Sequence, residues 1–465
     1  MADPMPIAHS REFRIRRFWN WFPLGLSYAF LYMGRYNLTV SKVALGDLMS
    51  KEAFGIIFAA GTITYAFAFL INGPLTDRIG GKRGMLIGMT GAAIANALLG
   101  ILTYGIRNSG WQLDLTLTFS IIYAMNMYFQ SYGAVSIVKV NASWFHVRER
   151  GVFGGIFGIL ISLGIYFAFD WGFAIVEATK VTPGYELSFV QGLIRSLTGA
   201  ANTSIDQTWW VFFIPAMILG VMLIIELILL KDVPSGAGFE DFDTADASSG
   251  EEDAPFSLKD ILKKIFTNKI LITIAFIEFC TGVLRNGIMH WYPIFAKEVL
   301  KLSPDHFMRE RWGLLLMLAG VIGGMTAGFL SDKVFGSRRG PVAALLYGSM
   351  FFGAVLMNFL LFNNNPLYLG LIVVFMSVCV IGTHGMLSGT STMDFGGRKA
   401  AGTAVGLIDG FVYLGTGFQS LSLGYLTTAN WSYWPPFLIP FTVIGFLLAV
   451  RIWKAMPTGK KAAVK

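Results

Sequence analysis

Long runs of apolar residues recur along the whole chain with few charges inside them. Twelve of these runs are long enough to cross a bilayer, which takes about 20 helical residues. They begin near Trp19, Ala53, Gly84, Leu115, Gly151, Trp209, Lys269, Trp312, Pro341, Leu367, Gly402 and Trp434. The runs are continuous, whereas membrane β-strands alternate polar and apolar residues over about 10 positions. The pattern therefore predicts an all-α membrane protein with twelve transmembrane helices.

One polar segment interrupts this pattern near the middle of the chain. Residues 232–266 are acidic, rich in small residues and poor in large apolar ones, which is typical of a flexible linker. The segment separates six apolar runs in residues 1–231 from six in residues 267–465. We expect two pseudo-symmetric six-helix bundles that rock about a central site, joined by a cytoplasmic linker.

Composition and charge add an orientation. Charged residues make up only 14% of the chain, against about 25% in soluble proteins. When both termini are placed inside the cell, most of the 36 Lys and Arg residues fall on cytoplasmic segments, as the positive-inside rule requires. The N-terminal stretch has no small-residue cleavage site, so the first span is expected to stay uncleaved. The basic residues are scattered over loops, and the net charge of +8 therefore does not indicate nucleic-acid binding.

A charged loop motif occurs once in each half. GPLTDRIGGKRG follows the second apolar run, and GFLSDKVFGSRRG follows the eighth. Asp77 and Asp332 are 255 positions apart, and each is followed by a basic residue, Arg78 or Lys333. The glycines permit a tight turn, and each Asp can bond a neighbouring helix end or arginine in one conformation. We predict that these four residues act in gating and do not contact the substrate.

The paired loops resemble the motif of the major facilitator superfamily. Other stretches resemble its organophosphate:phosphate antiporter family: GRYN at 34–37, FQSYG and VRERG within 129–151, LRNGIMHWYP at 284–293, SDKVF and RRG within 331–340, and RKAAGTAVG and YLG within 398–415. The similarity extends from about residue 20 to about residue 455. It implies a multi-pass protein of the cell inner membrane. It also implies exchange of a phosphorylated organic anion, such as a sugar phosphate or glycerol phosphate, for inorganic phosphate by alternating access.

Two arginines lie at corresponding depths in the two halves. Arg35 and Arg285 each come sixteen positions after the start of an apolar run. An arginine inside a bilayer costs at least about 2.5 kcal/mol, so each needs a compensating partner. Glu278 and Asp409 are candidate carboxylate partners; the alternative is a bound anion, because the guanidinium fork matches pairs of phosphate oxygens. In the family that the chain resembles, the arginines at these two positions are the phosphate ligands.

Further residues are candidate substrate contacts. The alternative reading is helix packing for the tyrosines and His384, snorkelling for Lys139, and neutralisation of a nearby cation for Asp409. Tyr28 and Tyr32 share a helical face with Arg35. The other candidates are Tyr65, Lys139, His384, Asp409 and Tyr413, of which Tyr65, Lys139 and Tyr413 match family positions. Phe69 and Ile161 stand where glycerol-phosphate members of the family have a cavity lysine and a cavity histidine. These two differences leave the identity of the organophosphate open.

The sequence has no nucleotide-binding motif and no His/Cys/Glu metal pattern. We therefore expect a secondary carrier, neither an enzyme nor dependent on a cofactor. Its expected partners are a small anionic substrate, inorganic phosphate and the lipid bilayer, and we expect a monomer. Three alternatives stay open: a carrier of another organic anion such as a carboxylate, a substrate sensor related to hexose-phosphate carriers, and a proton-coupled cation exporter. The positive charge in the cavity disfavours the exporter.

Overall fold

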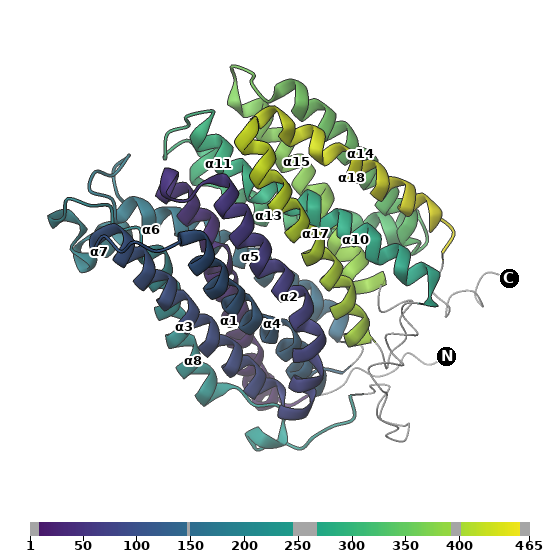
Figure 1. Ribbon diagram of the computed structural model, residues 1–465. Helices are drawn as coiled ribbons and strands as arrows, with labels where there is room; N and C mark the ends of the chain where they lie inside the picture. The colour runs from purple at the N-terminus through teal and green to yellow at the C-terminus, as the bar shows by residue number, and fades with distance from the viewer. Residues whose placement is uncertain (1–8, 147–148, 245–266, 392–400, 456–465) are drawn as a thin grey trace.

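The computed structural model of the protein describes residues 9–146, 149–244, 267–391 and 401–455, and the regular structure of these residues is all helical (Figure 1). The first half of the chain forms six long helical segments. They are α1 (Arg11–Leu45), α2 (Lys51–Ile79), α3 (Gly81–Asn108), α4 (Leu115–Trp144), α5 (Arg150–Tyr166) continued by η2 (Phe167–Trp171) and α6 (Gly172–Ala178), and α8 (Trp210–Leu229). The connections contain η1 (Gly46–Leu48), α7 (Phe189–Thr198), η3 (Ala200–Asn202) and η4 (Ser235–Ala237).

The second half repeats this arrangement with six more segments. They are α10 (Lys269–Met289) continued by α11 (Trp291–Glu298), α13 (Trp312–Phe329) continued by η5 (Leu330–Val334), α14 (Arg339–Leu360), α15 (Pro366–His384) continued by η6 (Gly385–Ser391), α17 (Ala401–Ala429) and α18 (Trp434–Arg451). The short α12 (Phe307–Glu310) and η8 (Trp431–Tyr433) lie in connections. The predicted twelve-helix fold is confirmed. The predicted starts agree within three residues, except that α1 begins eight residues before Trp19.

Three of the twelve segments differ from the rest in polarity. In the described part of the chain, nine segments are long and apolar enough to cross a membrane by length and composition alone. The others are α1, α4 and α17, with 35, 30 and 29 residues. Each carries a polar side chain well inside the helix: Arg35, Gln130 and Asp409. These three helices supply part of the site described below, together with α2, α10 and α15, which pass the hydropathy criterion.

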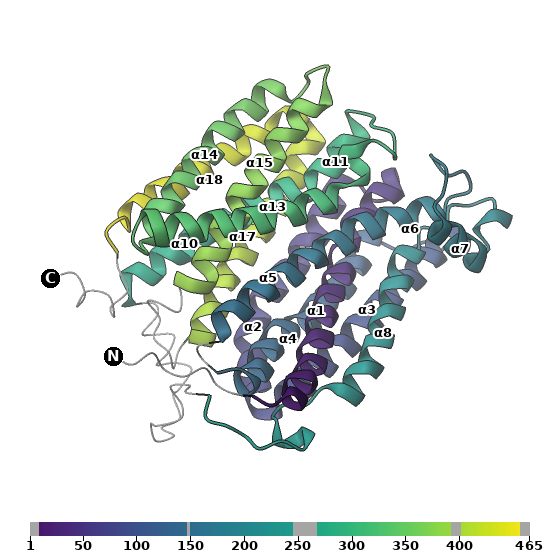
Figure 2. The same cartoon turned by 180° about the vertical axis from the view of Figure 1, so that it is seen from behind.

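The helices alternate in direction, so the start of α1 and the end of α18 lie on the same side of the molecule. We call this the terminal side and the opposite side the far side. On the face seen in Figure 1, α2 and α17 run side by side where the two halves meet. On the opposite face, α5 packs against α13 (Figure 2). The two halves thus meet along two helix pairs, with α1 and α10 between them.

At the far side, a cluster of charges joins the two halves. Nζ of Lys42, near the end of α1, lies 3.0 Å from a carboxylate oxygen of Glu298, at the end of α11. Nζ of Lys51, at the start of α2, lies 3.6 Å from the other oxygen. Lys42 is buried, so its pairing with Glu298 compensates a charge that has left water. One carboxylate therefore ties α1 and α2 of the first half to α11 of the second.

A second far-side contact joins the same halves through a helix terminus. Asp170 is buried in η2, and its carboxylate accepts hydrogen bonds from the backbone N–H groups of Gly313 at 2.6 Å and Leu314 at 3.2 Å. These groups belong to the first turn of α13, where N–H groups lack partners within the helix and the helix dipole favours negative charge. Asp170 thus caps a helix of the other half, and the far side is held closed in this structure.

Close packing of α10 against α17 positions the second half of the site. A Cβ atom at Gly282 would lie 1.9 Å from the carbonyl oxygen of Val412, and one at Gly415 would lie 2.1 Å from that of Phe279. Small residues permit this backbone-to-backbone approach between transmembrane helices. Arg285 follows Gly282 by about one turn, and the contact therefore brings it near residues of α17.

The first part of the predicted linker attaches to the first half. A carboxylate oxygen of Asp232 accepts the N–H of Lys82 in the first turn of α3 at 2.7 Å, and the indole of Trp144 donates to the carbonyl of Lys231 at 3.0 Å. Residues 245–266 of that linker, and residues 147–148 and 398–400 of two family motifs, lie outside the described residues. The boundaries of the two predicted bundles stay predictions.

Candidate functional site

Arg35 lies fully buried on α1 and donates to three neutral side chains. Its Nε donates to the amide oxygen of Gln130 on α4 at 2.9 Å. Its two terminal nitrogens donate to the hydroxyl groups of Tyr413 on α17, at 2.8 Å, and Tyr65 on α2, at 3.1 Å. The guanidinium carbon also lies 4.7 Å from the ring centre of Tyr32. The guanidinium group is thus held by the first half and reaches across to the second, without a carboxylate partner among the described residues.

Arg285 occupies the corresponding place on α10 and is also buried. Its Nε is enclosed without a hydrogen-bond partner in the described part of the chain. Tyr32 and Tyr413 both interact electrostatically with Arg285 as well as with Arg35, and Tyr36 also interacts with Arg285. The two arginines therefore face a common set of tyrosines, contributed by α1 and α17.

Tyr28 extends the aromatic face of α1 toward the terminal side. Its ring centre lies 5.4 Å from that of Tyr32 in an edge-on arrangement. Phe69, which the resemblance predicts to replace a cavity lysine, packs edge-on against Tyr65 with ring centres 4.6 Å apart and lies 6.4 Å from the ring of Tyr413. An apolar ring therefore lies beside the site at this position. Ile161, on α5, is partly buried.

Carboxylates gather beside Arg285 but none forms an ion pair with it among the described residues. Glu278 is fully buried on α10, and one of its oxygens lies 2.8 Å from Nδ1 of His384 at the end of α15. Its other oxygen, Oε1, is enclosed with no partner in the described chain. Asp409 on α17 accepts a hydrogen bond from the hydroxyl of Ser388. Ser388 follows His384 by four residues, so Asp409 lies about one helical turn from the pair of Glu278 and His384.

The structure places Lys139 apart from the arginines. Its ammonium group lies 3.2 Å from a carboxylate oxygen of Asp77, where the last turn of α2 meets α4 on the terminal side. The two side chains are 43% and 65% exposed, so the pair is screened by water and contributes little to stability. Lys139 thus joins a predicted gating residue instead of the tyrosines around Arg35. Its role in substrate binding stays a prediction.

The second charged loop closes on itself. One carboxylate oxygen of Asp332, in η5, accepts hydrogen bonds from Arg339 at 3.1 Å and from the hydroxyl of Ser337 at 3.0 Å. Arg78 and Lys333, the basic residues that follow the two aspartates, are exposed on the terminal side. All four predicted gating residues therefore lie away from the arginines, and the gating role itself stays a prediction.

Sequence reasoning missed two buried residues that complete the site. Gln130 is the acceptor for Arg35, and its amide in turn donates to Asn126. His290 lies where α10 ends, with Nδ1 2.7 Å from the hydroxyl of Thr39 on α1 and Nε2 3.2 Å from the amide oxygen of Asn286. Both lie within stretches that resemble the family, FQSYG and LRNGIMHWYP, so family resemblance was the signal that could have found them.

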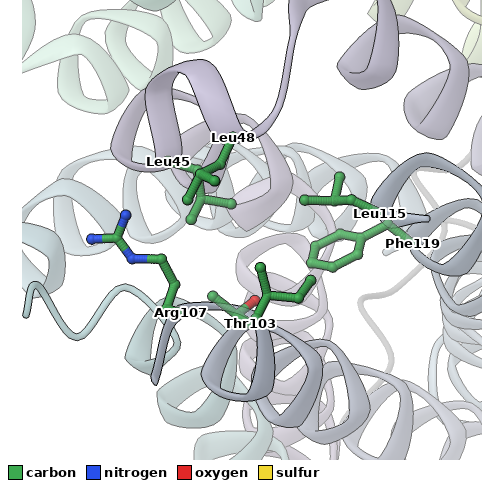
Figure 3. Close-up of a pocket in the computed structure, with 7 residues that line it drawn as sticks. Leu45, Leu48, Thr103, Arg107, Leu115 and Phe119 are labelled. Carbon is green, nitrogen blue, oxygen red and sulfur yellow. The ribbon is translucent and has the colours of Figure 1, made fainter. Parts of the chain in front are cut away.

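An apolar hollow shown in Figure 3 is a separate feature. It is lined at the far-side ends of α1, α3 and α4 by Leu45, Leu48, Thr103, Ile106, Arg107, Leu115 and Phe119. Leu45 lies ten residues beyond Arg35, or about 15 Å along α1. The hollow therefore belongs to the far-side end of the first half and is not part of the arginine site.

Known proteins that are similar to this chain include named transporters and a named membrane sensor. It is 28% identical over 448 residues to the glycerol-3-phosphate transporter of Bacillus subtilis, covering 94% of this chain and 91% of that protein. It is 25% identical to a probable hexose phosphate transport protein of Chlamydia trachomatis, covering 98% and 94%. It is 23% identical to a membrane sensor protein of Escherichia coli, covering 88% and 85%. The predicted resemblance to organophosphate:phosphate antiporters is confirmed by these relatives.

Solved structures share the fold. One is a bacterial homologue of the human lysosomal transporter Spinster in an inward-facing, unoccupied conformation, with a TM-score of 0.69 and 14% identity, covering 96% of this chain and 98% of that one. Another is a D-xylose–proton symporter, with a TM-score of 0.65 and 12% identity, covering 94% and 98%. Residues 24–420 match the Major Facilitator Superfamily as a family. The chain therefore belongs to the Major Facilitator Superfamily of multi-pass membrane transporters.

Proposed function

We propose that this protein is a secondary carrier that exchanges a phosphate ester for inorganic phosphate by alternating access. The observation that carries the proposal is the pair of buried arginines. Arg35 has only neutral partners and Arg285 keeps an enclosed Nε without one, among the described residues. A buried cation without a counter-ion is costly, and a bound anion removes that cost.

Phosphate suits these two arginines better than a carboxylate does. A phosphate monoester carries about −1.5 to −2 charges at neutral pH, which matches two guanidinium groups. Its oxygens also accept paired hydrogen bonds from a planar fork. The transporters named for glycerol 3-phosphate and hexose phosphate among the relatives support the same substrate class.

The closed far side supports the alternating-access part of the proposal. We take the terminal side to be cytoplasmic, as the distribution of basic residues predicts, so that in this proposal the closed far side is the external one. In the outward-facing state the contacts of Glu298 and Asp170 with the other half would have to open. An empty site in which neither arginine has an ion-pair partner among the described residues opposes this change, whereas a bound anion favours it. This difference between the empty and the anion-bound carrier favours exchange over net transport by a monomeric carrier.

Exchange in liposomes tests the proposal. Purified protein is reconstituted into vesicles loaded with inorganic phosphate, and uptake of labelled phosphate is measured with and without external glycerol 3-phosphate or hexose 6-phosphate. We expect phosphate-for-phosphate exchange that at least one ester inhibits and replaces. Uptake of a dicarboxylate or a neutral sugar without phosphate exchange would contradict the proposal.

A sensor is the second candidate, favoured by the similarity to the membrane sensor protein of Escherichia coli. A sensor and a carrier can share one binding site, so binding alone does not separate them. Saturable binding of a phosphate ester to the purified protein, without any flux in the same vesicle preparation, would support the sensor.

A further inference from the structure

The buried acids beside Arg285 have no part in binding phosphate, which they would repel. Glu278 pairs with His384, and Asp409 accepts a hydrogen bond from Ser388, which follows His384 by four residues. We propose that Glu278, His384 and Asp409 form a second subsite, which binds hydrogen-bond donors on the organic end of the phosphate ester. The donors are hydroxyl or ammonium groups. This inference rests on the proposed function, because it assumes that the arginines hold the phosphate end.

The position of the subsite along the helices fits a substrate with two ends. α10 and α17 both run from the terminal side to the far side. Glu278 precedes Arg285 by seven residues, about 10 Å along α10 and on the same helical face. Asp409 precedes Tyr413, a partner of Arg35, by four residues, about 6 Å along α17. The acids therefore lie on the terminal side of the arginines, where the organic end of a bound ester would be.

The hydrogen bonding of Glu278 leaves one acceptor unused. Oε2 is paired with His384, while Oε1 is enclosed and without a partner among the described residues. A buried carboxylate oxygen without a donor is unfavourable, and a substrate hydroxyl or ammonium group would satisfy it. Asp409 and His384 are only partly buried, so a ligand can contact them without a change in the helices.

A neighbouring part of the site, on α2, has a different chemistry. Phe69, on α2, presents an apolar ring beside Tyr65 and Tyr413. Acids on α10 and α17 and an aromatic ring on α2 suit a polyhydroxylated or aminated carbon chain. They do not suit an organic end that carries its own carboxylate, because that group would meet Glu278 and Asp409. The structure thus favours sugar, polyol or amino phosphates over phosphorylated carboxylic acids.

Matched pairs of esters test this subsite in the phosphate-loaded vesicles. Glycerol 3-phosphate and propyl phosphate share a phosphate and a three-carbon chain, but only the first has hydroxyl groups. Ethanolamine phosphate adds an ammonium group, and 3-phosphoglycerate adds a carboxylate. In the parent protein we expect glycerol 3-phosphate or ethanolamine phosphate to compete at least about tenfold better than propyl phosphate, and 3-phosphoglycerate to compete worst. Whichever of the first two is better identifies the donor.

Variants of Glu278 and Asp409 test whether these acids cause the preference for hydroxyl or ammonium esters over propyl phosphate. Glu278→Gln and Asp409→Asn should each reduce the ratio between the preferred ester and propyl phosphate by about tenfold, with a larger loss for the ammonium ester. Glu226→Gln is the matched control. Glu226 is also fully buried, with one oxygen 2.9 Å from the hydroxyl of Ser27 and the other without a partner in the described chain, but it lies on α8 away from the arginines. Its ratio should not change.

The outcomes separate the two proposals. If the parent shows no phosphate exchange at all, the proposed function fails. If exchange is present but propyl phosphate competes as well as glycerol 3-phosphate and ethanolamine phosphate, the subsite is wrong while the function stands. An unchanged ratio in both acid variants overturns it as well. If Glu278→Gln does not fold, Asp409→Asn still tests the subsite, because Asp409 is less buried than Glu278.

Discussion

Arg35 and Arg285 lie at corresponding depths in the two halves, yet their surroundings differ in kind. Arg35 is held by an amide and two hydroxyl groups from three other helices, α2, α4 and α17. Arg285 has an enclosed Nε without a partner among the described residues and lies beside Glu278, His384 and Asp409. Both halves therefore carry a buried arginine at the same depth, but the side chains around the two arginines differ. We infer that the first half supplies a fixed phosphate ligand, while the second half supplies a more adaptable one together with selectivity.

The largest effect should come from replacing the arginines themselves. Lysine keeps the charge but loses the planar fork, so Arg35→Lys and Arg285→Lys should each lose about 1.5–3 kcal/mol, or about ten- to a hundredfold in phosphate affinity. Arg35→Lys should be the more severe of the two, because it also breaks the hydrogen bonds to Gln130, Tyr65 and Tyr413. Equilibrium binding of labelled phosphate and exchange in vesicles check both variants. If both variants bind phosphate like the parent, binding depends on positive charge alone and not on paired hydrogen bonds from the guanidinium groups.

The next largest effect should follow from making Arg35 resemble Arg285. Gln130→Leu removes the acceptor of the Arg35 Nε and leaves that donor buried without a partner, at a cost of about 1–3 kcal/mol. Because Gln130 orients the guanidinium group, we expect phosphate affinity to fall about tenfold while the turnover of bound substrate changes little. Gln419→Leu is the control, since Gln419 is an equally buried amide on α17 that contacts neither arginine. Equal losses in both variants would show a general folding defect.

A smaller effect should appear at the far-side contact between the halves. Glu298→Gln weakens the pairing with Lys42 and Lys51, and we expect the outward-open state to gain about fivefold in population, or about 1 kcal/mol, because Glu298 is partly exposed. Spin labels on Leu48→Cys and Phe307→Cys, both exposed at the far side, would report the change in distance.

Glu310→Gln serves as the control for this experiment. Glu310 pairs at 3.2 Å with its neighbour Arg311, so its ion pair does not cross between the halves. An unchanged distance distribution in Glu298→Gln, or an equal shift in Glu310→Gln, would mean that Glu298 does not hold the far side closed.

The smallest effect should come from the two charged loops. Asp77 pairs with Lys139 of α4, whereas Asp332 bonds within its own loop and to Arg339. These exposed pairs are worth at most about 1 kcal/mol, so Asp77→Asn should slow exchange about two- to fivefold and leave equilibrium phosphate binding nearly unchanged. Asp332→Asn should behave alike if the loops have the same role. A large loss of affinity with normal turnover would contradict gating.

The sequence by itself determined the helices, the repeat and the two arginines. Continuous apolar runs can satisfy their backbone groups inside a bilayer only as helices, so the twelve segments follow from local pattern. The repeated loops and the equal depths of Arg35 and Arg285 are likewise visible along the chain. Polar residues inside α1, α4 and α17 lower their hydropathy, and an arginine inside a span is a candidate functional residue on sequence grounds alone.

Only the tertiary structure decided which groups meet. Gln130 and Tyr413 contact Arg35 from positions 95 and 378 residues away, and Glu278 pairs with His384 across 106 residues. The sequence suggested Glu278 as a carboxylate partner for Arg285, but packing of α10 against α15 directs it to the histidine. The sequence suggested Lys139 as a substrate contact, but its position on α4 brings it to Asp77. Side-chain partners depend on how helices cross and rotate, which hydrophobic pattern alone leaves unspecified.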